Sequence, residues 1–83
     1  MAGIVGVNTL KQATNANEAC KTGDYIMPST ASNIPVARWG ILKVSGNGGD
    51  AFQTINIIGS NDVYVRSKTS GGDWVDWRKI QLV

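Results

Sequence analysis

The sequence predicts a mainly β protein: a small antiparallel β domain of about five short strands with one short N-terminal helix. Two observations support this prediction. Apolar and polar residues alternate with a period of two in several short segments, which is the pattern of half-buried strands. Polar stretches rich in glycine separate these segments and are typical of turns. No helical connection of about a dozen residues lies between the segments, which argues against a parallel sheet.

The length and the composition limit the classes of protein to which the chain can belong. Its 83 residues fit one domain, and chains of this size bury only a little over ~60% of their unfolded surface. Cys20 is the only cysteine and there is no histidine, so an intrachain disulfide is excluded and a zinc site has no support. The commonest general base and the Cys/His nucleophile are also missing. We therefore expect no enzymatic activity, no metal and no cofactor.

The charge and hydropathy patterns bear on the partners. The net charge is +2, and the eight basic residues are scattered along the chain without a run, whereas nucleic-acid sites normally show a clustered basic footprint. No apolar run approaches the ~20 residues of a membrane span. Residues 1–10 also lack the basic start of a signal peptide. We expect neither nucleic-acid binding nor membrane insertion, and a chain that is made in a cytoplasm and stays there or is carried out by other proteins.

The first fourteen residues form a predicted attachment or linker segment, and residues 15–83 form the predicted β domain. The apolar residues of the segment are too irregularly spaced for an amphipathic helix. Left exposed, they would form an apolar patch, which usually marks an interaction surface. The predicted attachment residues are Ile4, Val5, Val7 and Leu10.

The predicted helix spans residues 15–20, where Thr14 or Asn15 can cap the first turn. Residues 24–27 follow as a short edge strand. Pro28 ends this strand, because proline cannot donate a hydrogen bond to a neighbouring strand.

Two strands are predicted after the polar loop at residues 29–37. They span residues 39–45 and 51–58, and the glycine-rich residues 46–50 form the turn between them. The second strand alternates clearly. Its two faces carry Gln53, Ile55 and Ile57 on one side and Phe52, Thr54, Asn56 and Ile58 on the other.

A last hairpin is predicted from residues 62–68, the turn at residues 69–73 and a closing strand at residues 74–80. The first of these strands places Val63 and Val65 on one face and Tyr64 and Arg66 on the other.

The closing strand contains Trp74 and Trp77, which are three residues apart and would face opposite ways in a regular strand. A bulge within Val75 and Asp76 would put both indoles on one side. Trp77 lies inside the strand and is predicted to be more buried than Trp39, which lies where a loop becomes a strand. A tryptophan buries on the order of 200 Å², so we expect at least one indole of this hairpin to be structural.

Several side chains are candidates for contacts with a glycan or another protein. Arg66 and Arg78 lie near aromatic residues, so each could stack on an indole or hold a sugar hydroxyl or carboxylate. Ordinary solvated or aromatic-stacked arginines are the alternative. Asp73 and Asp76 resemble the carboxylate pair of glycosidases, but aspartate is also an ordinary turn residue. The candidate contact residues are Trp39, Tyr64, Arg66, Trp74 and Arg78.

Residues 23–80 carry a series of short motifs in a distinctive order. The series is GDYIM after a short helical segment, an Asn33-Ile34-Pro35 loop, WGILKV, FQTI, VYVR, a glycine turn and DWVDWRKI. This order resembles the knob domain of pyocin and phage tail fibres. Residues 1–14 lie outside the resemblance.

The resemblance implies a virion component located in a phage tail and made in the host cytoplasm. It would be a module of a trimeric tail fibre or tailspike that assembles with other tail proteins and takes part in host-surface attachment, with a surface glycan as a possible receptor. A stand-alone carbohydrate-binding module is the alternative, and a small hydrolase would need a nucleophile and base that the sequence does not offer. A lectin needs an exposed ring facing a polar pocket, whereas a fibre joint needs its indoles buried.

Overall fold

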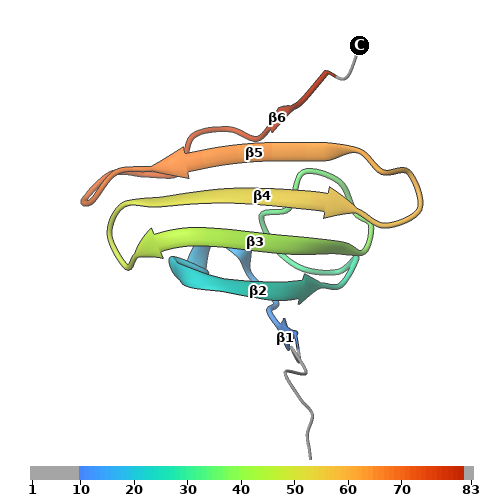
Figure 1. Ribbon diagram of the computed structural model, residues 1–83, viewed down its shortest axis with the longest axis horizontal. Coiled ribbons are helices and arrows are strands. Elements are labelled where there is room, and N and C mark those ends of the chain that lie inside the picture. The colour runs from blue at the N-terminus through green and yellow to red at the C-terminus, as the bar shows by residue number, and fades with distance from the viewer. Residues whose placement is uncertain (1–9, 82–83) are drawn as a thin grey trace, which may run out of the picture.

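The structure is a computed structural model that describes residues 10–81, and it contains a six-stranded sheet whose strands follow the order of the sequence (Figure 1). The predicted mainly β, antiparallel fold is confirmed. The elements are β1 (Lys11–Gln12), the 3-10 helix η1 (Ala16–Glu18), β2 (Lys21–Met27), β3 (Gly40–Asn47), β4 (Ala51–Ile57), β5 (Val63–Lys68) and β6 (Arg78–Lys79).

All neighbouring strands from β2 to β6 pair antiparallel, but β1 pairs parallel to β2. The argument against a parallel sheet holds for strands β2 to β6, and the parallel pair that β1 adds at this edge was not predicted. The pair involves only two residues, Lys11 opposite Tyr25 and Gln12 opposite Ile26. Because the two strands are parallel, the chain must run back from the end of β1, opposite Ile26, to the start of β2 at Lys21. This return covers about five residues of strand length, at roughly 3.3 Å each. The short segment that contains η1 can span this distance without a long helix.

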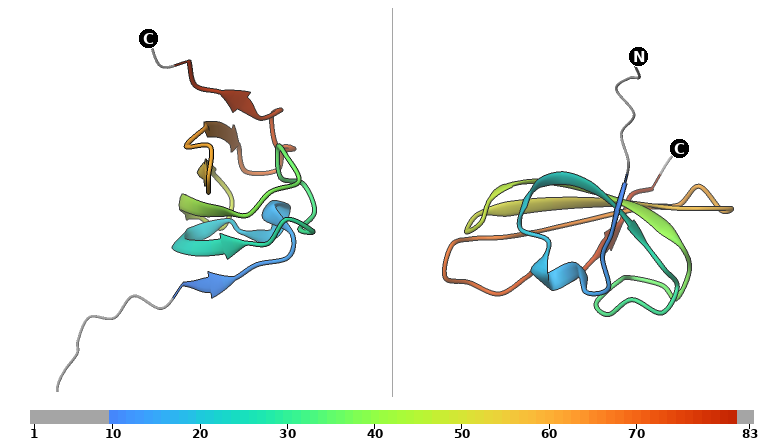
Figure 2. Two further views of the ribbon diagram at one scale, coloured as in Figure 1. Left: turned by 90° about the vertical axis from the view of Figure 1, so that its right-hand side faces the viewer. Right: turned by 90° about the horizontal axis from the view of Figure 1, so that it is seen from below.

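One face of the sheet carries the core. Leu42 of β3 and Ile55 of β4 are directly opposite each other and fully buried. The segment around η1 and the loop between β2 and β3 cover this face (Figure 2). The predicted faces of β4 are confirmed, because Gln53, Ile55 and Ile57 are buried and Phe52, Asn56 and Ile58 are exposed. The buried core residues are Ala16, Ala19, Met27, Leu42, Val44, Ile55 and Ile57, with Tyr64 and Trp77 among those packed against them.

The opposite face of the sheet has no helix or loop of residues 10–81 above it (Figure 2). Phe52 lies on this face and is 47% exposed, and Ile58, just after β4, is 50% exposed. Val63 and Val65 of β5 alternate with the inward-facing Tyr64 and Arg66 and are half-buried. The inward face of β5 is thus the mixed one, and the two valines face outward.

Two predicted strand boundaries are wrong. β2 begins at Lys21 rather than at residue 24 and is the second strand of the sheet rather than an edge. β3 continues through Gly46 and Asn47, which were assigned to the turn. Gly46 serves a close approach here, since a Cβ atom at this position would lie 2.5 Å from the Cys20 carbonyl oxygen. Strand β3 can therefore pass next to the chain that follows η1 only with glycine at this position.

The predicted helix is a single 3-10 turn rather than a helix over residues 15–20. Asn15 is its N-cap, as predicted, and its Oδ1 accepts a hydrogen bond of 3.0 Å from the Asn17 backbone N–H. The turn ends at once, because its C-cap Ala19 has the non-helical dihedral angles φ −89° and ψ 83°. The carbonyl of the following Cys20 accepts a hydrogen bond from the backbone N–H of Gly48 in the β3–β4 turn. None of the helices described in residues 10–81 is long and apolar enough to cross a membrane.

The closing strand is shorter than predicted, because residues 74–77 leave the sheet and only Arg78–Lys79 pair with β5. The Val75 N–H donates to the Ser67 carbonyl, whereas Arg78 lies opposite Val65. The closing segment therefore advances three residues, from Val75 to Arg78, while β5 advances two, from Ser67 to Val65. One extra residue on one of two paired segments is a β-bulge. It brings Trp74 and Trp77 to the same side, which is the arrangement expected when a bulge falls within Val75 and Asp76.

The predicted attachment residues Ile4, Val5 and Val7 lie outside the described residues, and Leu10, the first described residue, is half-buried. Strand β1 lies within the predicted attachment segment and is nevertheless part of the sheet.

Candidate functional site

A buried arginine lies at the centre of the candidate site. Arg66 points from β5 to the inner face of the sheet and is only 7% exposed. It lies directly opposite Gln53 of β4, and its Nε donates a hydrogen bond of 2.8 Å to Gln53 Oε1. The pairing register therefore sets the contact between the two side chains.

Gln53 connects this arginine to the N-terminal part of the domain. Its side chain is fully buried, and its Nε2 donates to the carbonyl oxygens of Ala16 at 2.7 Å and of Ala19 at 2.9 Å. A buried amide is costly unless it is hydrogen-bonded. Gln53 meets this requirement at both ends, and it thereby holds the turn of η1 under the sheet.

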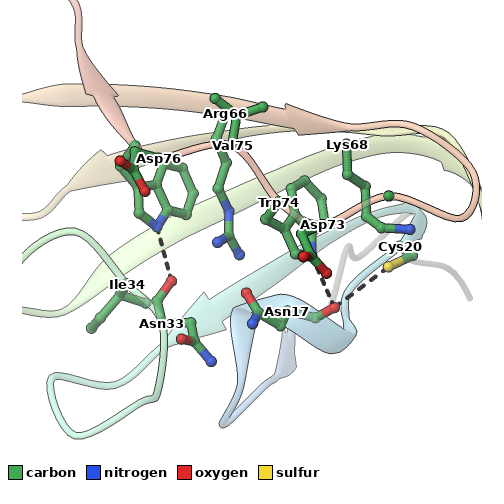
Figure 3. Close-up of a pocket in the computed structure, with 12 residues that line it drawn as sticks. Asn17, Cys20, Asn33, Ile34, Arg66, Lys68, Asp73, Trp74, Val75 and Asp76 are labelled. Carbon is green, nitrogen blue, oxygen red and sulfur yellow. Dashed lines mark hydrogen bonds between the residues drawn. The ribbon is translucent and has the colours of Figure 1, made fainter.

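Two indole rings flank the guanidinium group. The Cζ atom of Arg66 lies 4.3 Å from the ring centroid of Trp74 and 4.4 Å from that of Trp77, within the range of cation–π contacts. The indole N–H of Trp74 donates to the Asn17 carbonyl at 3.1 Å, and that of Trp77 donates to the Asn33 carbonyl at 2.8 Å (Figure 3). Both rings are thus fixed at their faces and at their nitrogens. We call Gln53, Arg66, Trp74 and Trp77 the arginine–tryptophan cluster.

The charge of Arg66 is only partly compensated. Burial lowers its pKa from the usual range of an arginine to about 10, and the nearby Cys20 acts in the opposite direction. The side chain therefore remains a cation at neutral pH. Its Nη2 atom is buried and has no hydrogen-bond partner among the described residues. Such a group calls for a physical explanation, because most buried donors in proteins are paired.

A pocket of about 540 Å³ opens beside the arginine–tryptophan cluster (Figure 3). Its walls come from the η1 turn, the loop after β2, the end of β5 and the segment that leaves the sheet. It contains two cations and two carboxylates. The lining residues are Asn17, Cys20, Asn33, Ile34, Arg66, Lys68, Gly72, Asp73, Trp74, Val75, Asp76 and Trp77.

The structure brings together only two of the five candidate contact residues, Arg66 and Trp74. Trp39 is 47% exposed and lies outside the pocket lining, and the half-buried Trp77 is more buried, as predicted. Tyr64 packs against the core, two residues before Arg66 on the same face. Arg78 is exposed on β6, opposite Val65.

Sequence reasoning missed several residues of the site. Lys68 was treated as part of an alternating strand, and Asn17 and Asn33 contribute backbone carbonyls, for which side-chain chemistry gives no signal. Gln53 did give a signal, because it was an amide on a face shared with two isoleucines. Such a residue needs a buried partner, and the arginine on the next strand in the sequence was available.

Asp73 and Asp76 are both exposed and line the same pocket. Within residues 10–81, no group of three or more His, Cys, Asp or Glu side chains is placed to hold a metal ion.

Comparisons with known proteins add no relatives. A scan against models of protein families finds no match to this chain, and searches of the curated proteins and of the solved structures find none either.

Proposed function

We propose that this chain is a non-enzymatic module of a phage tail fibre or tailspike, with a role in fibre assembly and host-surface attachment. One observation carries the proposal: three of the motifs that resemble the tail-fibre knob meet in the arginine–tryptophan cluster. FQTI supplies Gln53, VYVR supplies Arg66, and DWVDWRKI supplies Trp74 and Trp77. Their order along the chain therefore has a physical basis in one packed unit.

The environment of the tryptophans favours a structural module over a lectin of the usual kind. The two indoles of the pocket are held by Arg66 and by backbone carbonyls. The most accessible indole, Trp39, lies outside the pocket. An exposed ring outside this pocket suits a contact with a neighbouring subunit. A stand-alone carbohydrate-binding module remains the alternative function.

The uncovered face of the sheet supports association with further copies of the chain, in a homotrimer, or with other tail proteins. Phe52 on this face is 47% exposed, and Ile58, just after β4, is 50% exposed. Both side chains are available for contact with another chain. In this proposal the N-terminal segment, residues 1–14, attaches the module to its neighbours.

The mass of the full chain in solution and its location on particles test this proposal. Light scattering after gel filtration should give three times the chain mass of 8.8 kDa. Gold-labelled antibodies against the domain should mark the distal tails of particles from cells that express it. Incubation with bacterial surface polysaccharides should give binding without cleavage.

Deleting residues 1–10 tests the attachment segment separately. The shortened chain should fold but fail to join trimers or particles, because its apolar anchors are gone. A monomer that never labels a tail and binds soluble glycans would instead indicate the carbohydrate-binding module. A shortened chain that assembles normally would show that this segment is not the anchor.

A further inference from the structure

The unpaired donor of Arg66 is the starting point for a ligand site. A buried cation is unfavourable unless it is paired and its donors are bonded. Arg66 has a partner at Nε but none at Nη2. The one salt bridge within residues 10–81 joins Lys79 and Asp62, so no carboxylate of the described residues forms a salt bridge with Arg66. The guanidinium extends into the space between the chain segments of Asn33 and Asn17 (Figure 3).

We propose that this pocket binds the carboxylate of an acidic sugar, and that Arg66 donates the unused Nη2 hydrogen bond to it. The host surface as the source of this sugar rests on the proposed function, whereas the site itself rests on the geometry of the pocket. Because Nη2 is covered in the structure, binding requires a small rearrangement of the surrounding side chains. The two indoles that contact the guanidinium will report this rearrangement.

The charges of the pocket favour a singly charged ligand group. Arg66 and Lys68 are balanced by the exposed carboxylates of Asp73 and Asp76. A phosphate, with close to two negative charges, would be repelled by both carboxylates more strongly than a carboxylate group would be. Arginine also matches a carboxylate well, because its planar donors can bind two oxygens. A carboxylate is therefore the anion that this pocket fits best.

The remaining walls suit a ring that carries hydroxyl groups. The volume of about 540 Å³ lies in the range of roughly 300–1,000 Å³ found for small-molecule sites. The carboxylates of Asp73 and Asp76 can accept hydrogen bonds from sugar hydroxyls. Trp74 and Trp77 also line the pocket, and their rings offer apolar surface for the carbon-bound hydrogens of the sugar. A sugar acid uses both kinds of wall, whereas acetate would use only the cation.

The first experiment uses the unmodified full chain, so that no variant has to fold. D-glucuronate is titrated to about 10 mM, roughly ten times a weak dissociation constant of 1 mM, while the indole and arginine Nε–H resonances are followed by NMR. We expect saturable shifts for Trp74, Trp77 and Arg66 and none for Trp39, which lies outside the pocket. Glucose and glucuronamide, which lack the charge, should leave all four signals unchanged.

Three outcomes would overturn the site. They are unchanged resonances at the highest glucuronate concentration, equal shifts with glucuronamide, and equal shifts with chloride or inorganic phosphate. The last would mean adventitious anion binding only.

Two variants with the same loss of charge add a second measurement. Lys68→Gln removes a cation that lines the pocket, and Arg78→Gln removes one from β6 outside it. We expect Lys68→Gln to weaken glucuronate binding about two- to fivefold, as for a partly exposed ion pair, and Arg78→Gln to leave it unchanged. Equal effects of the two variants would indicate a general response to net charge and would contradict the site.

Cell-binding assays separate the site from the proposed function. Glucuronate binding without binding to any bacterial surface would keep the site and refute the attachment role. Attachment to cells that free glucuronate does not reduce, together with unchanged resonances, would refute the site and keep the attachment role.

Discussion

Replacing Gln53 with leucine tests whether the arginine–tryptophan cluster stabilises the fold. Leucine has a similar size and suits a buried strand, so the change removes hydrogen bonds without leaving a large cavity. The Ala16 carbonyl keeps a bond of 3.2 Å from the Ala19 N–H. The Ala19 carbonyl and the Nε of Arg66 lose their side-chain partner.

Each orphaned buried group costs about 1–3 kcal/mol, and a charged group costs more. We therefore expect Gln53→Leu to lower the free energy of unfolding by roughly 3–5 kcal/mol, a large part of the 5–15 kcal/mol typical of a domain. Urea unfolding followed by tryptophan fluorescence measures this difference. Gln12→Leu makes the same chemical change at an exposed position of β1 and should stay within about 0.5 kcal/mol of wild type.

A double-mutant cycle checks the mechanism. Arg66→Met removes the cation that donates a hydrogen bond to Gln53. The double variant should therefore lose less free energy of unfolding than the sum of the losses of the two single variants, by about 0.5–3 kcal/mol. A loss below about 1 kcal/mol for Gln53→Leu, or strict additivity with Arg66→Met, would refute our account of this network.

Three further predictions concern single positions. Trp77→Ala should lower the free energy of unfolding by about 3 kcal/mol or more, because it removes core contacts and a hydrogen bond. Trp39→Ala should leave thermal unfolding almost unchanged and should reduce association measured by light scattering. Similar losses of stability in the two variants would show that the core is misplaced. The pKa of Arg66 is lower in the folded state than in the unfolded state, so the unfolded state binds more protons above about pH 10. The free energy of unfolding of wild type, relative to that of Arg66→Met, should therefore rise between about pH 8 and about pH 11 in paired denaturant titrations. A difference that falls over this range would contradict the desolvation argument. Gly46→Ala should destabilise the domain in thermal melts by about 1–3 kcal/mol, because its Cβ would overlap the Cys20 carbonyl, and a neutral effect would mean that the two segments separate easily.

Local patterns in the sequence were sufficient to predict the sheet. The alternation around Ile55 in β4 reflects a strand with one buried face, and each hairpin turn has its own glycine or asparagine signal. The bulge that brings the two indoles to one side also followed from local spacing. Such features depend on neighbours along the chain, so one sequence is enough to predict them.

The candidate site depended on contacts that have no local signal. Residues 74–77 have the composition of a strand, but their indole nitrogens bond to carbonyls of residues 57 and 44 positions earlier. Tertiary contacts therefore overrode a local preference, as often occurs for strands. The parallel pairing of β1 was missed for the same reason, because a strand of two residues shows no alternation.

The sequential order of the strands implies that different contacts control the rate of folding and the rate of unfolding. Strands β2 to β5 pair with neighbours in sequence, so their hairpins close short loops, and such local contacts form early on the folding pathway. The bonds from Gln53 to Ala16 and from Trp74 to Asn17 join residues 37 and 57 positions apart and would form after the transition state. Contacts that form late mainly slow unfolding. The arginine–tryptophan cluster would then act as a clasp that sets how long the folded domain survives before it unfolds.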